Sequence, residues 1–355
     1  MPITAVQETL EDTGLQRLNV LQADAIRTLS DQFYALHDAA YQRFGAGARD
    51  ACREDFAFHL EFLRPVLEFG LLQPMVDYLH WLDSVLVSRG IPTDHLALSL
   101  DWLAEFLLAN MEARHGAIVV KALQLVRDAF QAGGPKPPSL PAPDAWPDAA
   151  ELEAALLSGD QSGSLAIVNR LMDAGHRLVD IEGHVIQPAM YHIGEKWQAN
   201  QVTVAQEHMA TAIAQMVMTM GLLRSPLPTP NGKRVLFACV EGNHHVVGVS
   251  MVSDAFQLAG WDVQYLGANV PTASLVRHVV ESAPDLVGLS VSFPQQLRVV
   301  RDVIARLSEQ LGTARPPVIV GGLAINRFNG LANMVGADSC SADARAAVTH
   351  AQSLV

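Results

Sequence analysis

The chain has 355 residues, 50% hydrophobic and 17% charged, which is enough for two or three domains and excludes a disordered protein. Its formal net charge is −13, and since residues 233–355 contain nine basic and nine acidic side chains, the whole acidic excess lies in residues 1–232. A region this acidic repels phosphate backbones, so direct nucleic-acid binding is disfavoured.

Residues 1–132 are predicted to form an all-helical N-terminal domain with a sensory or interaction role. Apolar residues recur at helical spacing in 58–70 and 75–86, with Pro74 suited to a helix start and Gly90 to a helix end. The domain is rich in imidazole and aromatic side chains, namely His37, His59, His80, His95, His115, Tyr78, Trp81 and Trp102. On helices such residues are most often packing or surface groups.

Two proline-rich segments divide the rest of the chain. Residues 133–147 contain six prolines and two glycines, which predicts a stiff, extended linker. Residues 148–224 then show four helical patterns with short connections: 148–157, 162–173, a long helix reaching Trp197, and 203–223. They predict an antiparallel four-helix bundle. Residues 225–232 form the second linker.

From residue 233 onward the pattern alternates between strand and helix. Strands are expected at 234–240, 262–266, 285–291, 317–321 and 337–339. Helices are expected at 247–258, 273–282, 296–311, 327–334 and 343–353. Alternating units of this length predict a Rossmann-like (flavodoxin-like), doubly wound parallel sheet at 233–355. The fold class of the whole chain is therefore α followed by α/β.

A polar loop follows the first of these strands and contains Asn243, His245 and Gly248. In open α/β sheets, ligands bind at the carboxyl ends of strands. An imidazole there can be an axial metal ligand, with Asn243 accepting a hydrogen bond from its other ring nitrogen. An isolated His-x-x-Gly, however, more often belongs to a loop that caps a helix.

Small residues end the third and fourth strands. Ser290 and Ser292 lie at the end of the third strand, and Gly321 and Gly322 lie at the end of the fourth. Together they predict a deep slot in which a long, narrow group could lie against the backbone. Taken singly, each is equally typical of a tight turn.

These residues resemble the motif of the cobalamin-binding domains of methionine synthase and corrinoid proteins: Asp-x-His-x-x-Gly, then a serine motif, then Gly-Gly. The resemblance implies that His245 is the lower axial ligand of cobalt, replacing the cofactor's own dimethylbenzimidazole. It also implies a pocket for the displaced nucleotide tail lined by Ser290, Ser292, Gly321 and Gly322. Two positions depart from the motif, Asn243 in place of Asp and Ser292 in place of Leu. An uncharged Asn243 would leave the imidazole less electron-rich.

A second resemblance involves the predicted bundle. Trp197 precedes the pair Glu207-His208 at a spacing that resembles the light-sensing cobalamin photoreceptors of the CarH type. This implies that the three residues enclose the upper adenosyl group of adenosylcobalamin, held base-off and His-on between bundle and sheet. Gln198 stands where those proteins have a His that captures cobalt after photolysis, so His192 or His208 would have to substitute. A lone Trp is otherwise most often a core residue.

The N-terminal domain departs from those repressors, which begin with a winged helix-turn-helix. A multi-helix domain ahead of a cobalamin module resembles instead the photocobilin subfamily, which implies a bilin such as biliverdin close to cobalamin. We expect His80 and Trp81 to contribute to its pocket, with the bilin bound noncovalently.

Three readings of the chain follow. The first is a cobalamin-dependent light sensor without catalytic activity, signalling through self-association, as a homodimer or larger, or through a protein partner. The alternative is a corrinoid methyl carrier of a methyltransferase system, which needs an open upper face that Trp197 and Glu207-His208 would obstruct. The third is a helical interaction protein whose sheet domain has lost its ligand, which the intact sheet motif argues against.

The cysteines and the apolar runs bear on localisation. Cys52, Cys239 and Cys340 show no Cys-x-x-Cys spacing, so neither a disulfide framework nor a structural zinc site is expected. The N-terminal sequence does not resemble a signal peptide, and no apolar run approaches the ~20 residues that cross a bilayer. We expect a cytoplasmic protein that does not bind membranes.

Overall fold

The computed structural model describes residues 8–41, 43, 45, 47–133, 144–226, 228–328 and 330–355. The chain divides into two compact units, Met1–Pro138 and Ser139–Val355, and each is described by itself. The predicted linker at 133–147 lies outside the described residues except at 133 and 144–147, as does residue 227 of the second linker.

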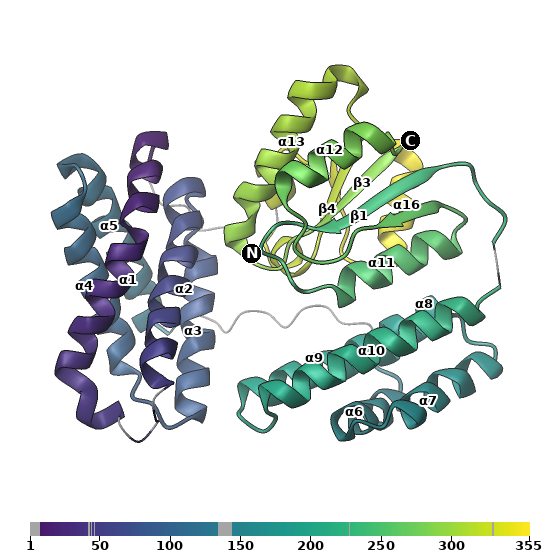
Figure 1. Cartoon of the computed structure of the whole chain (residues 1–355), viewed down its shortest axis with the longest axis horizontal. Coiled ribbons are helices and arrows are strands. Elements are labelled where there is room, and N and C mark those ends of the chain that lie inside the picture. The colour runs from purple at the N-terminus through teal and green to yellow at the C-terminus, as the bar shows by residue number, and fades with distance from the viewer. Residues whose placement is uncertain are drawn as a thin grey trace. The chain divides into compact units, whose positions relative to one another are not determined.

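The first unit is all-helical (Figure 1). Its helices are α1 (Asp12–Tyr41), α2 (Ala48–Phe69), α3 (Leu72–Ser88), α4 (Asp94–Asn110) and α5 (Ala113–Gln131). The apolar spacing expected from the sequence faces the core, since Leu60, Leu63 and Leu67 of α2 are buried. Helix α2 ends at Gly70, whose left-handed conformation lets its N–H reach the last carbonyls of the helix.

The four-helix part of the second unit begins with α6 (Asp148–Ser158) and α7 (Gln161–Asp173). The long helix expected next is α8 (Leu178–Ile181) and α9 (Gln187–Gln198), joined by a π-helical turn, η2 (Glu182–Ile186). The last helix, α10 (Val204–Arg224), starts with a capping box in which Thr203 and Gln206 satisfy each other's backbone N–H groups. Apolar residues of all these helices form one core, which also includes Met251 of α11 (Val247–Leu258).

The sheet is fully parallel, with strand order β2-β1-β3-β4-β5. Its strands are β1 (Arg234–Cys239), β2 (Asp262–Tyr265), β3 (Leu286–Ser290), β4 (Val318–Gly321) and β5 (Ser339–Cys340). Helices α11 and α16 (Ala344–Leu354) cover one face, and α12 (Thr272–Ser282) and α13 (Leu297–Leu311) cover the other (Figure 1). The predicted fold class is confirmed. One expected helix, 327–334, is wrong: two short helices, α14 (Leu323–Arg327) and α15 (Leu331–Met334), occupy this region.

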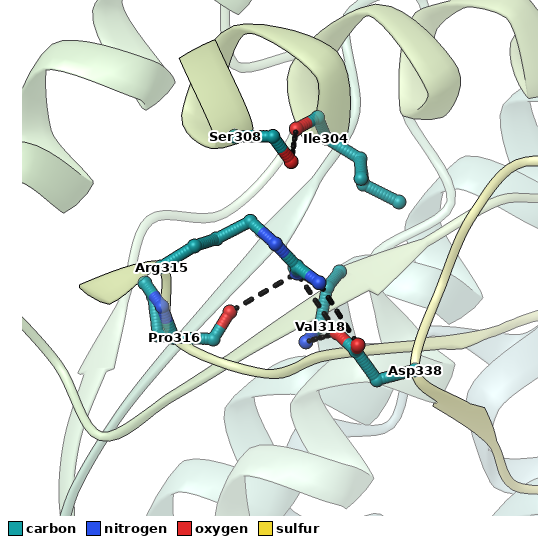
Figure 2. Close-up of polar contacts among 6 residues, drawn as sticks. All are labelled: Ile304, Ser308, Arg315, Pro316, Val318 and Asp338. Carbon is teal, nitrogen blue, oxygen red and sulfur yellow. Dashed lines mark hydrogen bonds and ion pairs between the residues drawn. The ribbon is translucent and has the colours of Figure 1, made fainter. Parts of the chain in front are cut away.

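An ion pair joins the segments that lead into β4 and β5 (Figure 2). Arg315 donates two hydrogen bonds to the carboxylate of Asp338, at 2.8 and 2.9 Å, and the Val318 N–H donates a third at 2.7 Å. Burial raises the pKa of Asp338, but the hydrogen bonds from Arg315 and Val318 together lower it by more than burial raises it. The pKa of Asp338 therefore lies below its usual value.

Within the second unit, the bundle packs on the sheet through α11. Helices α8 and α10 both contact α11, and Asp180 of α8 forms an ion pair with Arg345 of α16. Two acids also meet in this contact: Glu182 of η2 is 1% exposed and Asp254 of α11 is 8% exposed. The bundle therefore rests on the face of the sheet that α11 and α16 cover.

Two further expectations concern the whole chain. Among the described residues, none of the helices combines the length and hydropathy needed to span a bilayer. Cys52, Cys239 and Cys340 are unpaired thiols.

Candidate functional site

The carboxyl ends of three neighbouring strands align at one edge of the sheet. Cys239 of β1 is in register with Ser290 of β3, which is in register with Gly321 of β4. The small residues that the sequence places at strand ends thus lie in one row. Ser290 and Ser292 are both buried.

The loop after β1 is held by hydrogen bonds to Asn269 and Gln296, which lie in the connections that follow β2 and β3. The Gly242 N–H donates to Asn269 Oδ1 at 2.8 Å, and the Asn269 N–H donates to the Asn243 carbonyl at 2.8 Å. On its other side, Gln296 Nε2 donates to the Gly242 carbonyl at 2.9 Å. The backbone leading to His245 is therefore fixed before any ligand is considered.

Asn243 is fully buried, and its amide is used differently from our expectation. Its Nδ2 donates to the Ser290 carbonyl at 2.9 Å, and its Oδ1 accepts the backbone N–H of His245 at 3.1 Å. We had expected the amide oxygen to accept a ring N–H of His245. A backbone carbonyl and a backbone N–H together determine the orientation of this amide, because only the NH₂ group can face a carbonyl.

His245 presents its imidazole to solvent, with its ring edge-on to Phe293 at 5.1 Å between centroids. Although the side chain is accessible, surrounding protein atoms desolvate the ring and lower its pKa; the charge of Glu207 opposes this shift, and His244 adds to it. Neutral imidazole is the form that binds a metal.

Three glycines near this loop test whether a large flat group fits. A Cβ added at Gly248 would meet nothing within 4 Å, and one at Gly321 would be 3.6 Å from the nearest atom. Protein packing therefore does not require glycine at either position, and both leave room beside the loop. Gly322 differs, because its φ of +99° and the Val291 carbonyl, 2.5 Å from an added Cβ, demand glycine. The residues present fit a bulky group approaching the backbone here.

The bundle residues Trp197, Glu207 and His208 lie on either side of the turn from α9 to α10. Trp197 is half-buried near the end of α9. Glu207 accepts a hydrogen bond from Thr211 Oγ1 at 3.0 Å and pairs with His208 Nδ1 at 2.7 Å. Helix α10 contacts α11, the helix that follows the loop after β1, and the charge of Glu207 raises the pKa of His245.

His192 takes part in a contact inside the bundle. Its Nδ1 lies 3.3 Å from a carboxylate oxygen of Glu153, a buried residue of α6 that also pairs with Lys196. His192 thus contacts Glu153, whereas Glu207 influences the pKa of His245 through its charge.

In the first unit, His80 and Trp81 are adjacent on α3 but have different neighbours. The His80 ring lies 4.9 Å from that of Phe130 on α5, whereas Trp81 lies 6.3 Å from Tyr78 and is partly exposed. Among the described residues, His80 Nε2 is buried without a hydrogen-bond partner. The structure does not gather these two rings around one point.

Other histidines of this unit form pairs. The His59 ring bonds the Tyr78 hydroxyl at 2.9 Å in the core, and the His37 and His95 rings lie 4.2 Å apart.

Sequence reasoning missed Gln296 and Asn269, which connect the site's loops. Nothing in the local pattern marks them, since both are single polar residues in loops or helix starts. It also missed the capping box of Thr203 and Gln206, which the spacing Thr-x-x-Gln does signal.

Comparison with known families finds two matches, both inside the second unit. A family described as "B12 binding domain" matches residues 233–351, and a second family of the same description matches residues 149–220. The two matches coincide with the sheet and the helical bundle.

Curated relatives are of two kinds. The chain is 31% identical over 209 residues to dimethylamine corrinoid protein 2 of Methanosarcina acetivorans, covering 55% of this chain and 95% of that protein. It is 30% identical over 171 residues to the HTH-type transcriptional repressor CarA of Myxococcus xanthus, covering 47% of this chain and 54% of the repressor. The chain thus spans about half the length of that repressor.

Among solved structures, the monomethylamine corrinoid protein of Methanosarcina barkeri is similar, with a TM-score of 0.50 and 20% identity. The match covers 58% of this chain and 97% of that one. It shows a shared fold.

Proposed function

The chain belongs to the family of B12-binding corrinoid proteins and binds cobalamin, and from this premise we propose that it is a light sensor rather than an enzyme. In this proposal residues 148–224 cap the cofactor and residues 233–355 hold it from below. Residues 1–132 receive or transmit the signal, with 133–147 and 225–232 as linkers. We assign it to the cytoplasm, in keeping with its three unpaired thiols.

His245 is the proposed lower ligand of cobalt. Its pKa is lowered, so its imidazole is neutral near pH 7 and available to a metal. Asn243 holds the loop through its hydrogen bonds to the Ser290 carbonyl and the His245 N–H. The proposed walls of the nucleotide-tail pocket are Ser290, Ser292, Gly321 and Gly322. Gly248 leaves open space on the same loop.

The observation that supports a sensor is the position of the turn from α9 to α10. Trp197, Glu207 and His208 flank this turn, α10 contacts α11, which follows the His245 loop, and the charge of Glu207 raises the pKa of His245. We propose that this indole and carboxylate–imidazole pair cover a bound adenosyl group, which would obstruct a partner enzyme. Cobalamin with an adenosyl upper ligand supplies a cobalt–carbon bond that visible light cleaves. In our proposal, loss of the adenosyl group would release the side chain of Trp197. This would change self-association or the binding of a protein partner. We propose His208 rather than His192 for a free coordination position, because the His192 side chain contacts the buried Glu153 inside the bundle.

A second chromophore is part of the proposal. We propose that the first unit binds biliverdin noncovalently, with His80 as one contact, since its buried Nε2 lacks a protein partner among the described residues. Trp81 is the neighbouring candidate.

A corrinoid methyl carrier is the second candidate function. Coverage favours it: the chain matches 95% of the dimethylamine corrinoid protein but only 54% of the CarA repressor. The carrier would use the same lower site with cobalt open to a methyltransferase.

Illumination separates the two candidates. Protein loaded with adenosylcobalamin in the dark should change its absorption spectrum irreversibly under green light and change its oligomeric state or partner binding. A changed spectrum with an unaltered hydrodynamic radius and unaltered partner binding would contradict the sensor, and methyl transfer from methylcobalamin with a methyltransferase would support the carrier.

Variants test the residue assignments. His245→Ala should weaken cobalamin retention about tenfold or more, whereas His244→Ala, its exposed neighbour, should not. Trp197→Ala should reduce the preference for adenosylcobalamin over methylcobalamin with little loss of overall affinity. Adding biliverdin should produce a red-absorbing band that His80→Ala weakens, and the absence of any band would remove the bilin from the proposal.

A further inference from the structure

Gln296 lies between the two loops that shape the cobalamin site, and no sequence motif marks it. It is 4% exposed, at the end of the short 3-10 helix η3 (Pro294–Gln296) that follows β3. A buried amide needs hydrogen-bond partners for both its oxygen and its NH₂ group. Its partners therefore show what this side chain is for.

Both ends of the amide bind loop backbone. Gln296 Nε2 donates to the Gly242 carbonyl at 2.9 Å, in the loop after β1. Its Oε1 accepts the backbone N–H groups of Ser292 at 2.9 Å and Phe293 at 3.1 Å, in the loop after β3. One side chain thus sets the separation of the two loops.

Each loop contributes directly to the surroundings of His245. Gly242 lies three residues before His245, and Phe293 places its ring edge-on to the imidazole at 5.1 Å. Ser292 is a proposed wall of the tail pocket. A change in Gln296 would therefore alter both the orientation of the His245 imidazole and the width of the proposed tail slot.

We infer that Gln296 is a positioning residue for cobalamin binding, which acts through Gly242 and Phe293 to orient the His245 imidazole and set the width of the tail slot. The inference rests on the proposed role of His245. It differs from a general packing role because the amide's donor faces one loop and its acceptor faces the other.

Gln296→Glu tests this with almost no change in shape. The carboxylate still accepts from Ser292 and Phe293, but it has no hydrogen to donate to the Gly242 carbonyl, and the two oxygens repel. At pH 8 we expect affinity for adenosylcobalamin, measured in the dark on the full chain, to fall about tenfold to a hundredfold. The spectrum should shift towards that of cobalamin without a nitrogen ligand. Burial at this position and the facing Gly242 carbonyl raise the pKa of the introduced carboxyl. A larger fraction is therefore protonated at pH 5.5 and can donate again, so the affinity ratio to the unchanged protein should rise towards one.

Gln310→Glu is the matched control. It makes the same chemical change at an exposed position of α13 that contributes nothing to the proposed site. Its affinity should stay within about twofold of the unchanged protein.

The outcomes separate this inference from the function on which it rests. If the unchanged protein binds cobalamin with a nitrogen ligand that His245→Ala removes, the site assignment stands. Gln296→Glu with unaltered affinity and spectrum at pH 8 would then overturn the positioning role alone, as would an equal loss in Gln310→Glu. If His245→Ala leaves the spectrum unchanged, the site assignment itself fails.

Discussion

Asp254→Asn should stabilise the second unit at neutral pH, although it removes a charge from a buried contact. Asp254 on α11 and Glu182 in the π-helical turn are both buried, and among the described residues both carboxylate oxygens of Glu182 lack a hydrogen-bond partner. Burial raises the pKa of Asp254 to about 6. Burial, followed by the charge of Asp254, raises that of Glu182 well above its usual value.

The magnitude follows from the shift at Asp254. Its pKa rises from 3.8 unfolded to about 6 folded, and one pKa unit corresponds to about 1.4 kcal/mol, so ionising it in the folded state costs up to about 3 kcal/mol. Because the folded state binds the proton more tightly, the contribution of Asp254 to the free energy of unfolding is greatest below pH 3.8 and falls as the pH rises to about 6. An Asn cannot ionise and avoids this loss.

Hydrogen exchange of the β1 and α11 amides, measured by mass spectrometry from pH 5 to 8, reports the stability of this unit by itself. Protection in Asp254→Asn should exceed that of the unchanged protein by an amount that grows from pH 5 to a little above pH 6 and then stays constant. Asp302→Asn, an exposed acid on α13 paired with Arg306, is the control and should change protection by less than about 0.5 kcal/mol. Equal protection in Asp254→Asn and the unchanged protein at pH 8, or a gain that does not depend on pH, would refute the reasoning.

Three other substitutions test the packing around the site. Asn243→Asp restores the usual motif residue but puts a carboxylate against the Ser290 carbonyl, so we expect a loss of about 1–3 kcal/mol at pH 8 that shrinks at low pH; a more stable variant in thermal unfolding would contradict this contact. Asp338→Asn should lose about 1 kcal/mol at pH 7 with its Arg315 ion pair. Because the Asp338 pKa is lowered, its stabilisation is present above the unfolded pKa and disappears as the pH falls, so melting curves should converge in acid. Gly322→Ala should cost about 2 kcal/mol or more, since its φ is +99° and a Cβ would strike the Val291 carbonyl, and an unchanged melting temperature would contradict that strain.

The π-helical turn shows where sequence periodicity stops being informative. The pattern from 178 to 197 reads as one helix, and the chain is helical throughout, but η2 shifts the helix by one residue at Glu182. Periodicity records which positions are apolar. It does not record that an acid is buried opposite another acid on a different helix.

By itself, the sequence determined the order and type of the elements, the parallel sheet, and the residues at the strand ends. Apolar spacing and glycine or proline positions act within a few residues, so they can be read locally. Only the tertiary structure decided that Cys239, Ser290 and Gly321 align in register and that Gln296 joins two loops. It also decided that Asn243 bonds a neighbouring strand's carbonyl rather than the His245 ring. Those contacts join residues 31 to 54 positions apart, and their geometry exists only once the strands pair and the helices pack.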